Sequence, residues 1–479
     1  MGKLSIMIKQ SDCKHIQWGE GCTVYLMGIG GIGMGGLAEV LLSRGCQVRG
    51  SDLVANKVVQ HLRTLGADIA LGHDDVGLEG VQALVCTSAI PLDHPMKKAA
   101  DGHSIPCLSR AAMLALLVKG KSLIAVSGTH GKTTTTALTS HLLTAADLDP
   151  GYFVGGHVPT LEGLAHDGKG DWVVVEADES DASFLTLTPD ITVITNVDED
   201  HLENYSGGFE AIKETFLTFI EQLNPNGLVI LCADCPGVQA LLSRISVPTI
   251  TYGFSPDADV RITAYKQEGL QSQIKILWEA GAEEALTVSL PGRHNALNAL
   301  ASLLVAKRLG VRAQAKQALA TFSGVDRRLQ VYGKCVVDSK GVLLLEDYGH
   351  HPVELNVTLE AVRSAWSSAR LVWVFQPHRY TRTQAFLKAF SEVLAKGDVV
   401  ILLPVYAASE APIANADSQA LGLAVKHLGQ KACYVLDNVN ALDGVLAQVL
   451  KEDDILLFQG AGDIGRCAIR LSKSCITNK

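Results

Sequence analysis

The segment from Ser122 to Leu143 limits the possible folds most, because an apolar strand, a glycine-containing loop and a helix follow one another in it. The loop carries the pattern Gly-x-x-Gly-Lys-Thr at residues 128–133. Val126 stands where the longer Walker pattern has its outer glycine, but successive amides and a helix amino terminus still face an anion. This order predicts a parallel α/β sheet with a phosphate-binding loop at the end of one strand.

Strand-like and helical segments alternate along most of the chain, which indicates several α/β units. At 479 residues the chain is too long for one hydrophobic core, since single cores stop growing at about 250–300 residues. Strand-like pieces follow one another without helices between about residues 260 and 290, which indicates a small antiparallel patch. We therefore expect an α/β protein with three domains, at residues 1–119, 120–323 and 324–479.

The overall composition excludes several classes of protein. The formal net charge of −9 argues against a nucleic-acid-binding protein, which usually requires a basic face. No apolar run approaches the roughly 18 residues of a membrane helix, and the amino-terminal segment lacks the apolar core of a signal peptide. We expect a cytoplasmic protein without nucleic-acid or membrane partners, and the sequence leaves the oligomeric state open. The 11 scattered cysteines are predicted to be reduced thiols.

A second glycine loop occupies residues 28–33 and reads Gly-Ile-Gly-Gly-Ile-Gly. It follows the predicted strand Thr23–Met27 and opens a helix, so its amides would receive a diphosphate. Asp52 ends the next strand, where an acid often meets a ribose hydroxyl, and from these residues alone NAD is the favoured ligand. The similar pattern at residues 460–465 is predicted to pack a helix against a strand, because little chain follows it.

The residues around the Gly-Lys-Thr loop suit a nucleoside triphosphate with Mg²⁺. Lys132 would reach the β- and γ-phosphate oxygens, and the Thr133 hydroxyl would ligate Mg²⁺. Glu176 ends an apolar strand, so its carboxylate is a further expected Mg²⁺ ligand. The acid-rich run 196–201 would bring His201 or a carboxylate to a second metal ion or to the transferred phosphoryl group.

Polar segments late in the chain suit the nucleotide and a carboxylate substrate. The segment 291–298 opens a helix with polar side chains that would frame a base. Arg327 and Arg328 lie in a predicted linker and would clamp phosphates if the linker closes over ATP. Residues 347–352 and 376–382 follow predicted strands, and their histidines and arginines suit a carboxylate ligand.

In these motifs and their order, the chain resembles the Mur ligases of peptidoglycan synthesis over nearly its whole length. The shared motifs are Gly-Ile-Gly-Gly-Ile-Gly-Met, Gly-Thr-His-Gly-Lys-Thr-Thr-Thr-Thr, Glu-Ala-Asp-Glu-Ser-Asp, Asp-His at 200–201, Gly-Arg-His-Asn-Ala-Leu-Asn-Ala, Asp-Tyr-Gly-His-His-Pro and Gln-Pro-His-Arg-Tyr-Thr-Arg. Two places depart from the family pattern. Gly35 stands where a small hydroxyl residue is common, and residues 343–346 read Leu-Leu-Leu-Glu where a second acid is more usual.

The resemblance implies a Rossmann-like domain that binds a UDP-sugar, a central P-loop ATPase-like domain and a Rossmann-like carboxyl-terminal domain that binds an amino acid. It implies a ligase that uses ATP and Mg²⁺ to join L-alanine to UDP-N-acetylmuramate through an acyl phosphate, with release of ADP and phosphate. The first glycine loop would then hold UDP, not NAD. An alternative within the family is a ligase that adds a preformed tripeptide to the same UDP-sugar. The intact Gly-Ile-Gly-Gly-Ile-Gly loop favours L-alanine.

The resemblance also implies roles for individual residues. The expected catalytic residues are Lys132, Glu176, His201, Arg328 and His350, and the expected metal ligands are Thr133, Glu176 and His201. The residues expected to bind ATP are Gly128, Thr129, His130, Gly131, Lys132, Thr133, Thr134, Asn295, Arg328 and Asp347. Those expected at the UDP-sugar are Gly28, Gly30, Gly31, Ile32, Gly33, Asp52, His73, Ser88 and, at its phosphates or at the acyl phosphate, Arg327. Those expected at alanine are Tyr348, His350, His378, Arg379 and Arg382.

Two other classes of protein compete with a ligase. A nicotinamide oxidoreductase would use the loop at residues 28–33 but would leave the Lys132 loop without a role. A non-catalytic P-loop protein would leave the histidines and arginines of the last domain without a role. Failure to bind NAD(H) would exclude the first of these classes.

Overall fold

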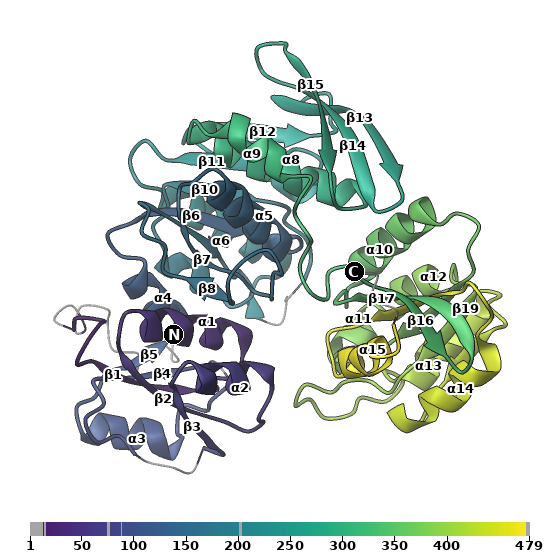
Figure 1. The fold of residues 1–479 in the computed structure, drawn as a ribbon, viewed down its shortest axis with the longest axis horizontal. Helices are drawn as coiled ribbons and strands as arrows, with labels where there is room; N and C mark the ends of the chain where they lie inside the picture. The colour runs from purple at the N-terminus through teal and green to yellow at the C-terminus, as the bar shows by residue number, and fades with distance from the viewer. Residues whose placement is uncertain (1–12, 14–15, 74–76, 88, 201–203, 476–479) are drawn as a thin grey trace. The chain divides into compact units, whose positions relative to one another are not determined.

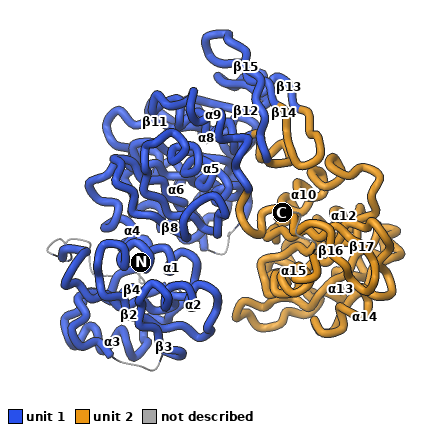
Figure 2. The backbone as a smooth tube through the Cα atoms, in the orientation of Figure 1, with its two compact units in different colours: residues 1–265, 274–289, 297–323 blue, residues 266–273, 290–296, 324–479 orange. Residues whose placement is uncertain are grey.

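The structure is a computed structural model that describes residues 13, 16–73, 77–87, 89–200 and 204–475. It confirms the predicted α/β class, with three sheets dominated by parallel pairing and helices between the strands (Figure 1). The chain forms two compact units (Figure 2). Unit 1 comprises residues 1–265, 274–289 and 297–323, and unit 2 comprises residues 266–273, 290–296 and 324–479. The division into three domains stays a prediction.

The first sheet has the order β3-β2-β1-β4-β5, with all neighbours parallel. Its strands are β1 (Thr23–Met27), β2 (Gln47–Asp52), β3 (Asp68–Leu71), β4 (Ala83–Cys86) and β5 (Cys107–Ser109). Its helices are α1 (Ile32–Ser43), α2 (Lys57–Thr64), α3 (Pro95–Gly102) and α4 (Arg110–Leu117). The strand order reverses beside β1, and the first glycine loop follows β1 at the sheet edge where ligands bind in such folds.

The second sheet has ten strands in the order β15-β14-β13-β12-β11-β10-β6-β9-β7-β8. They are β6 (Ser122–Ser127), β7 (Gly151–Phe153), β8 (Ala165–His166), β9 (Trp172–Glu176), β10 (Ile191–Ile194), β11 (Leu228–Cys232), β12 (Thr249–Gly253), β13 (Val260–Glu268), β14 (Gln271–Leu277) and β15 (Glu283–Val288). Strand β6 pairs in parallel with both β10 and β9, which places the phosphate loop at a second reversal of strand order.

The helices associated with this sheet follow its strands in the chain. They are α5 (Lys132–Ala145), α6 (Gly208–Glu221), α7 (Pro236–Leu242), α8 (Arg293–Arg308) and α9 (Arg312–Ala318), with the 3₁₀ helix η2 (Ser183–Thr186). Helix α5 begins at Lys132, directly after Gly131, whose left-handed backbone conformation ends the phosphate loop.

The third sheet, in unit 2, has the order β16-β17-β21-β18-β19-β20. Its strands are β16 (Gln330–Val337), β17 (Lys340–Asp347), β18 (Leu371–Phe375), β19 (Val399–Leu402), β20 (Cys433–Val435) and β21 (Ile455–Gln459). Its helices are α10 (Pro352–Ala365), α11 (Tyr380–Ala385), α12 (Leu387–Leu394), α13 (Ser418–His427), α14 (Leu442–Val449) and α15 (Ile464–Ser472), with the 3₁₀ helix η4 (Val439–Ala441). Only β16 and β17 pair in an antiparallel way among the strand pairs described for this sheet. Strand β18 reads Leu-Val-Trp-Val-Phe and is buried throughout, as expected for an interior strand covered on both faces.

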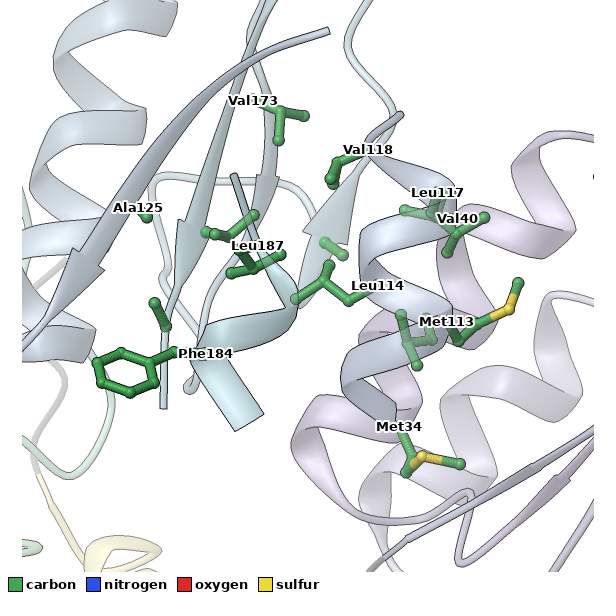
Figure 3. Packing of buried hydrophobic residues seen from close by; sticks show 14 of the residues in the cluster. Met34, Val40, Met113, Leu114, Leu117, Val118, Ala125, Val173, Phe184 and Leu187 are labelled. Atoms are coloured by element: carbon green, nitrogen blue, oxygen red, sulfur yellow. The ribbon is translucent and has the colours of Figure 1, made fainter. Parts of the chain in front are cut away.

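The core of unit 1 is continuous between its two sheets. Leu114 and Leu117 of α4 belong to one hydrophobic cluster with Val40 of α1, Val173 of β9 and Phe184 of η2 (Figure 3). Such a shared core stabilises the two sheets together, because separating them would expose this apolar surface to water.

Glu39 of α1 is a buried acid that joins the first sheet's layer to strand β8. Its Oε2 accepts hydrogen bonds from the amides of Leu164 and Ala165, at 2.8 and 2.9 Å. Its Oε1 lies 3.3 Å from Nε2 of His61. Burial raises the pKa of the Glu39 carboxyl, although the two amides oppose that shift. Helix α1, which begins at the first glycine loop, is therefore fixed to the edge of the second sheet.

We expect Glu39→Ala to lower the free energy of unfolding by about 2–4 kcal/mol, because two buried amides would lose their acceptor. Urea denaturation measures this loss. The matched control is Glu79→Ala, which removes an exposed carboxylate from the same part of the chain. Equal stability of the two variants would contradict the role given to Glu39.

The prediction that all cysteines are reduced thiols is wrong for one pair. Cys335 in β16 and Cys475 after α15 form a disulfide. The reason is that the chain returns to the edge strand β16, where an isolated antiparallel bridge brings the two residues together across a separation of 140 positions. Cys22, Cys46, Cys86, Cys107, Cys232, Cys235, Cys433 and Cys467 form no disulfide in the part of the chain that the structure describes. Cys235 has Cys-x-x-Cys spacing with Cys232, but its thiol contacts the backbone of Val197.

No helix in the described part of the chain combines the length and the apolar character needed to cross a membrane.

Candidate active site

The phosphate loop connects β6 to α5, as predicted. Gly128 and Gly131 have φ angles of +128° and +84°, a region that glycine adopts far more readily than other residues. A Cβ on Gly128 would lie 2.3 Å from the Thr195 hydroxyl oxygen, and one on Gly131 would lie 3.0 Å from Oδ1 of Asn298. A larger residue at position 128 or 131 would therefore have a strained backbone and would be too close to neighbouring atoms.

Two residues after β10 hold the phosphate loop in place. The His130 amide donates to Oδ1 of Asn196 at 2.8 Å, and Nδ2 of Asn196 donates to the His130 carbonyl at 2.8 Å. The Thr195 hydroxyl donates to the same carbonyl at 2.6 Å. The Thr129 amide donates to the Asn196 carbonyl at 3.2 Å. Neither Thr195 nor Asn196 was predicted to have this role; the available signal was an amide and a hydroxyl at the end of a strand neighbouring the loop.

Lys132 begins α5 and contacts an acid from the segment after β9. Its Nζ lies 2.8 Å from Oε2 of Glu179 and donates to the Gly128 carbonyl at 2.7 Å. Burial alone would lower the pKa of Lys132, but the nearby carboxylates, Glu179 foremost, raise it above its usual value. The side chain is therefore an ammonium ion at neutral pH, held at the opening of the phosphate loop.

Glu176 ends β9 and meets the second residue of α5. The Thr133 hydroxyl donates to Oε1 of Glu176 at 3.1 Å, and the Gly155 amide donates to Oε2 at 2.9 Å. A hydroxyl and a carboxylate at this spacing are the hard oxygen ligands that Mg²⁺ prefers. These residues fit the predicted metal site, in which Mg²⁺ would bind between the loop and the phosphate oxygens.

The third predicted metal ligand, His201, lies outside the described residues. The run that leads to it is described as far as Asp200. Within that run, Oδ2 of Asp198 lies 3.6 Å from Nε2 of His130, so one carboxylate of the acid-rich segment faces the phosphate loop. The Asp198 amide donates to the Thr129 hydroxyl at 2.9 Å. Asp198 therefore lies beside the phosphate loop, and the role of this segment at a second metal ion or at the phosphoryl group stays a prediction.

Arg110, at the start of α4, lies near the first glycine loop and near the segment that follows β9. Its Nη2 is 3.7 Å from Oδ2 of Asp178, which follows β9. A Cβ on Gly33, the last glycine of the first loop, would lie 3.0 Å from Cδ of Arg110. Arg110 was not predicted as a site residue, because a single arginine in an apolar helix belongs to no recognisable sequence motif.

The first glycine loop is shaped by two polar residues that follow β2. The Gly30 amide donates to Oδ2 of Asp52 at 2.9 Å, and Nδ2 of Asn56 donates to the Gly30 carbonyl at 2.9 Å. A Cβ on Gly30 would lie 2.9 Å from polar atoms of both residues. Asp52 therefore has a structural contact with the loop in addition to its predicted contact with a nucleotide.

The remaining predicted residues of this site lie along the same loop and its neighbours. Gly31 is the N-cap of α1, and the Ile32 side chain is exposed. The Gly28 amide donates to the Ser51 carbonyl at 2.8 Å, and the Ser51 hydroxyl lies 2.8 Å from Nδ1 of His73. His73 is thus brought to the strand that faces the glycine loop. Ser88 lies outside the described residues.

Asp347, at the end of β17, is buried and accepts hydrogen bonds at both oxygens. Oδ1 accepts from the Gly349 amide at 2.8 Å and from Nε2 of Gln459 at 2.7 Å, and Oδ2 accepts from the Leu329 amide at 2.9 Å. Burial raises the pKa of Asp347, with Arg328 as the strongest opposing influence. The Asp347 carboxylate therefore fixes the backbone of the linker and of the turn at residues 348–350. These hydrogen bonds use oxygen lone pairs that a direct contact with the nucleotide would also need.

Arg327 contacts protein groups that the sequence did not predict. Its Nε donates to Oε1 of the buried Glu346 at 2.8 Å, and its Nη2 donates to the Gly460 carbonyl at 3.0 Å. A Cβ on Gly465 would lie 2.6 Å from the same Glu346 oxygen. The loop at residues 460–465 is therefore tightly packed against protein atoms, which supports its predicted packing role. Both Arg327 and Arg328 lie over the Tyr348 ring, with their guanidinium carbons 4.8 and 5.0 Å from its centroid.

The side chains expected at alanine gather within unit 2. The His350 ring is 5.5 Å from the Tyr348 ring and 5.6 Å from the His378 ring, measured between centroids. Nη1 of Arg382 lies 3.2 Å from Nδ1 of His378. The structure thus brings together residues from the segment after β17 and from the segment after β18, as predicted from the carboxyl ends of parallel strands.

A third segment, after β19, completes this cluster and was not predicted. The Arg379 amide donates to the Tyr406 carbonyl at 2.8 Å, and the Tyr406 ring stacks on His378 with centroids 5.6 Å apart. Oε1 of Glu410 lies 3.2 Å from Nε of Arg379 and accepts from the Thr381 hydroxyl at 2.7 Å. The signal in the sequence was weak, because one tyrosine and one acid follow β19 without a histidine or arginine beside them.

Two asparagines of the segment 291–298 have different surroundings. Nδ2 of Asn295 donates to the Pro291 carbonyl at 2.8 Å, and the side chain is buried. Asn298 lies one turn further along α8 and is the residue nearest to a Cβ placed on Gly131. Asn298 thus lies beside the phosphate loop and was not predicted, and the contact of Asn295 with the nucleotide stays a prediction.

Models of three protein domains match the chain. They are described as "Mur ligase family, catalytic domain" over residues 23–122, "Mur ligase middle domain" over residues 126–306 and "Mur ligase, glutamate ligase domain" over residues 327–462. A UDP-N-acetylmuramate–L-alanine ligase from Halorhodospira halophila (strain DSM 244 / SL1) is 45% identical over 443 residues, which are 92% of this chain and 91% of that protein. The chain belongs to the Mur ligase family.

Solved structures of Mur ligases have the same fold. The crystal structure of UDP-N-acetylmuramate-alanine ligase from Thermotoga maritima matches with a TM-score of 0.82 and 28% identity, over 94% of this chain and 98% of that one. A murein peptide ligase from Psychrobacter arcticus 273-4 matches with a TM-score of 0.70 and 20% identity, over 95% and 100% of the two chains. At 20% identity this second likeness shows the fold alone.

Membership of the Mur ligase family confirms the predicted family and makes the chain a ligase. It also removes the reason to expect NAD at the first glycine loop, since residues 23–122 match a Mur ligase domain. The pattern Gly-x-Gly-x-x-Gly was misleading because any loop that receives a diphosphate at a helix amino terminus has the same geometric requirements.

Proposed function

We propose that this Mur ligase joins L-alanine to the lactyl carboxylate of UDP-N-acetylmuramate, with hydrolysis of ATP to ADP and phosphate. The observation that carries the proposal is the cluster of Lys132, Thr133 and Glu176 at the phosphate loop, in a chain 45% identical to a UDP-N-acetylmuramate–L-alanine ligase. Because two of the proposed substrates, ATP and UDP-N-acetylmuramate, are nucleotides, we also place the protein in the cytoplasm.

The phosphate loop serves the activation of the carboxylate. A carboxylate does not react with an amine until one of its oxygens becomes a good leaving group, and transfer of the γ-phosphoryl group supplies that leaving group. The Lys132 ammonium stabilises the negative charge of the transferred group, and the amides of residues 128–134 bind the phosphates. Thr133 and Glu176, with His201 as a third proposed ligand, would hold Mg²⁺, which would supply positive charge beside the phosphate oxygens.

The first glycine loop holds the UDP-sugar in this proposal. Gly28 to Gly33 present amides and the amino terminus of α1 to the diphosphate, and Asp52, His73 and Ser88 contact the nucleotide. Arg328 and Asn295 contact ATP, while Asp347 acts through the turn that it organises. The ion pair of Arg327 with Glu346 favours a supporting role for Arg327 over a phosphate contact.

The cluster in unit 2 binds the amino acid. Arg379 and Arg382 offer planar guanidinium groups that match a carboxylate, and Glu410 holds Arg379 in position. Tyr348, His350 and His378 surround the amine end. These residues all lie within one unit, so their arrangement does not depend on how the two units are placed.

We expect Asp52→Ala to weaken UDP-N-acetylmuramate binding by about tenfold to a hundredfold, because the Gly30 amide loses its acceptor and the loop loses its shape. Titration calorimetry with the UDP-sugar measures this change. The affinity for ATP, measured in parallel, should stay at the wild-type value. Unchanged UDP-sugar affinity in the variant would contradict the assignment of the first loop.

Isotope transfer tests the acyl phosphate directly. With the lactyl carboxylate of UDP-N-acetylmuramate labelled with heavy oxygen, one labelled atom should appear in each phosphate released. The label reaches phosphate because the C–O bond of the acyl phosphate breaks when the amine attacks. Unlabelled phosphate formed together with the amide product would contradict an acyl phosphate on this carboxylate.

A further inference from the structure

Two imidazoles in the amino-acid cluster of unit 2 face different hydrogen-bonding partners. His350 lies between β17 and α10, and His378 lies between β18 and α11, with ring centroids 5.6 Å apart. Both side chains are partly buried. Their partners fix which ring nitrogen carries the proton in each case, and this decides which histidine is able to accept a proton from a substrate.

His378 is held as a hydrogen-bond donor. Nη1 of Arg382 lies 3.2 Å from its Nδ1, and a guanidinium only donates, so Nδ1 accepts and the ring proton lies on Nε2. Burial lowers the pKa of His378 to about 3, and the nearby guanidinium groups of Arg382 and Arg379 add to that effect. His378 is therefore neutral at physiological pH and does not take up a second proton there.

His350 has the opposite arrangement. Its Nδ1 lies 3.3 Å from the Tyr348 carbonyl oxygen and 3.6 Å from Oε2 of Glu354, which are both acceptors. The proton of the neutral ring is therefore on Nδ1, and Nε2 carries the lone pair. Glu354 is itself fixed, since its Oε2 accepts from the His350 amide at 2.8 Å and from the His351 amide at 3.1 Å. A carboxylate behind an imidazole stabilises the imidazolium that forms when the ring accepts a proton.

We propose that His350 is the general base that removes a proton from the ammonium group of the incoming amino acid, and that His378 is a neutral donor that only positions the substrate. The inference rests on the proposed function. One ammonium proton passes to Nε2 of His350, and the amine lone pair then attacks the acyl carbon. The C–N bond forms and the C–O bond to phosphate breaks with its electron pair. The second amine proton leaves with the phosphate, and His350 returns its proton to solvent.

The proposal separates the two halves of the reaction. Formation of the acyl phosphate needs ATP and the UDP-sugar but no amine, so it should not need His350. Only the attack of the amine should depend on it. A variant at His350 should therefore accumulate acyl phosphate at the wild-type rate and turn it over slowly.

The decisive experiment compares two amino acids in His350→Gln. With L-alanine, kcat should fall about a hundredfold, a usual contribution of a general base. With 3,3,3-trifluoroalanine, whose amine is largely deprotonated at neutral pH, the deficit should shrink by on the order of tenfold or more. Trapping of the acyl phosphate with borohydride, without any amino acid, should give the wild-type amount.

Two further variants serve as matched controls. His378→Gln keeps a donor and should raise KM for both amino acids, with an equal deficit for each. Glu354→Gln preserves the hydrogen-bonding shape at the start of α10 and should show a smaller loss than His350→Gln, with the same relief by trifluoroalanine.

Several results would overturn the proposal. The base assignment fails if His350→Gln loses activity equally with both amino acids, or if His378→Gln is the variant that trifluoroalanine relieves. It also fails if His350→Gln no longer forms acyl phosphate, because the residue would then act before the amine. Absence of trapped acyl phosphate in the wild-type protein would instead reject the proposed function and the base assignment together.

Discussion

Lys132→Ala is expected to abolish product formation and to leave UDP-N-acetylmuramate binding intact. The ammonium group lies at the opening of the phosphate loop, where it would stabilise the charge of the transferred phosphoryl group. Its removal should lower kcat by at least about a thousandfold, the upper part of the range for loss of one group that stabilises developing charge. Phosphate release measures kcat, and calorimetry with the UDP-sugar measures binding.

A control has to show that loss of activity does not come from unfolding. Lys132→Ala removes the ammonium group that contacts the buried Glu179, and an uncompensated buried carboxylate destabilises the fold. The double variant Lys132→Met with Glu179→Gln removes both charges and should unfold at nearly the wild-type temperature. It should be as inactive as Lys132→Ala. Turnover at the wild-type rate in either variant would reject the role given to this loop.

Gly128→Ala is expected to have the second largest effect on activity. The added Cβ would lie 2.3 Å from the Thr195 hydroxyl oxygen and 2.8 Å from the Asn196 carbonyl oxygen, the two residues that hold the loop. Displacement of the loop by about 1 Å should lower kcat/KM for ATP by about a hundredfold. Steady-state kinetics with ATP as the varied substrate measures the effect.

The control variant Gly120→Ala shows how much of the effect of Gly128→Ala comes from backbone strain and how much from collision of the added Cβ with neighbouring atoms. Gly120 also has a positive φ angle, +90°, but no heavy atom lies within 4 Å of its added Cβ. It should lose about 1 kcal/mol of stability from the conformation alone and keep its affinity for ATP. If both variants lose ATP affinity equally, the close packing of Thr195 and Asn196 against the loop does not explain the requirement for glycine.

The sequence predicted the strands and loops that depend on local pattern. The apolar run Leu371–Phe375 is a strand with those bounds, and Thr23–Met27 is another, because a buried parallel strand requires a continuous apolar segment. The phosphate loop was located because Gly128, Lys132 and Thr133 have to occur at fixed spacing. The nearness of Glu176 to Thr133 followed from the rule that the ends of neighbouring parallel strands meet at one sheet edge.

Features that depend on contacts distant in sequence were not predicted. Asn196, in the segment after β10, contacts the phosphate loop at His130, which lies 66 positions earlier in the sequence. Glu410 reaches Arg379 from the segment after β19. The disulfide partner of Cys335 is 140 positions away. In each case the local sequence resembles an ordinary loop or strand edge, and only the tertiary fold brings the partners together.

The roles of single polar residues were the least predictable part of the candidate site. Arg327 was expected at a phosphate, yet its guanidinium contacts Glu346 and the Gly460 carbonyl. Asp347 was expected at the nucleotide, which stays a prediction, and its carboxylate accepts hydrogen bonds from Gly349, Gln459 and Leu329 that were not predicted. A motif fixes which residue types are needed, but the hydrogen bonds of a buried charge depend on the whole neighbourhood.

Phosphate release from ATP, measured with UDP-N-acetylmuramate and a panel of amino acids and peptides, tests the proposed function most directly. The panel contains L-alanine, glycine, L-serine and the preformed tripeptide. We predict that release requires both ATP and the UDP-sugar and that L-alanine gives the highest kcat/KM, with no release above background for the tripeptide. Release that proceeds without the UDP-sugar, or that the tripeptide supports better than L-alanine does, would contradict the account.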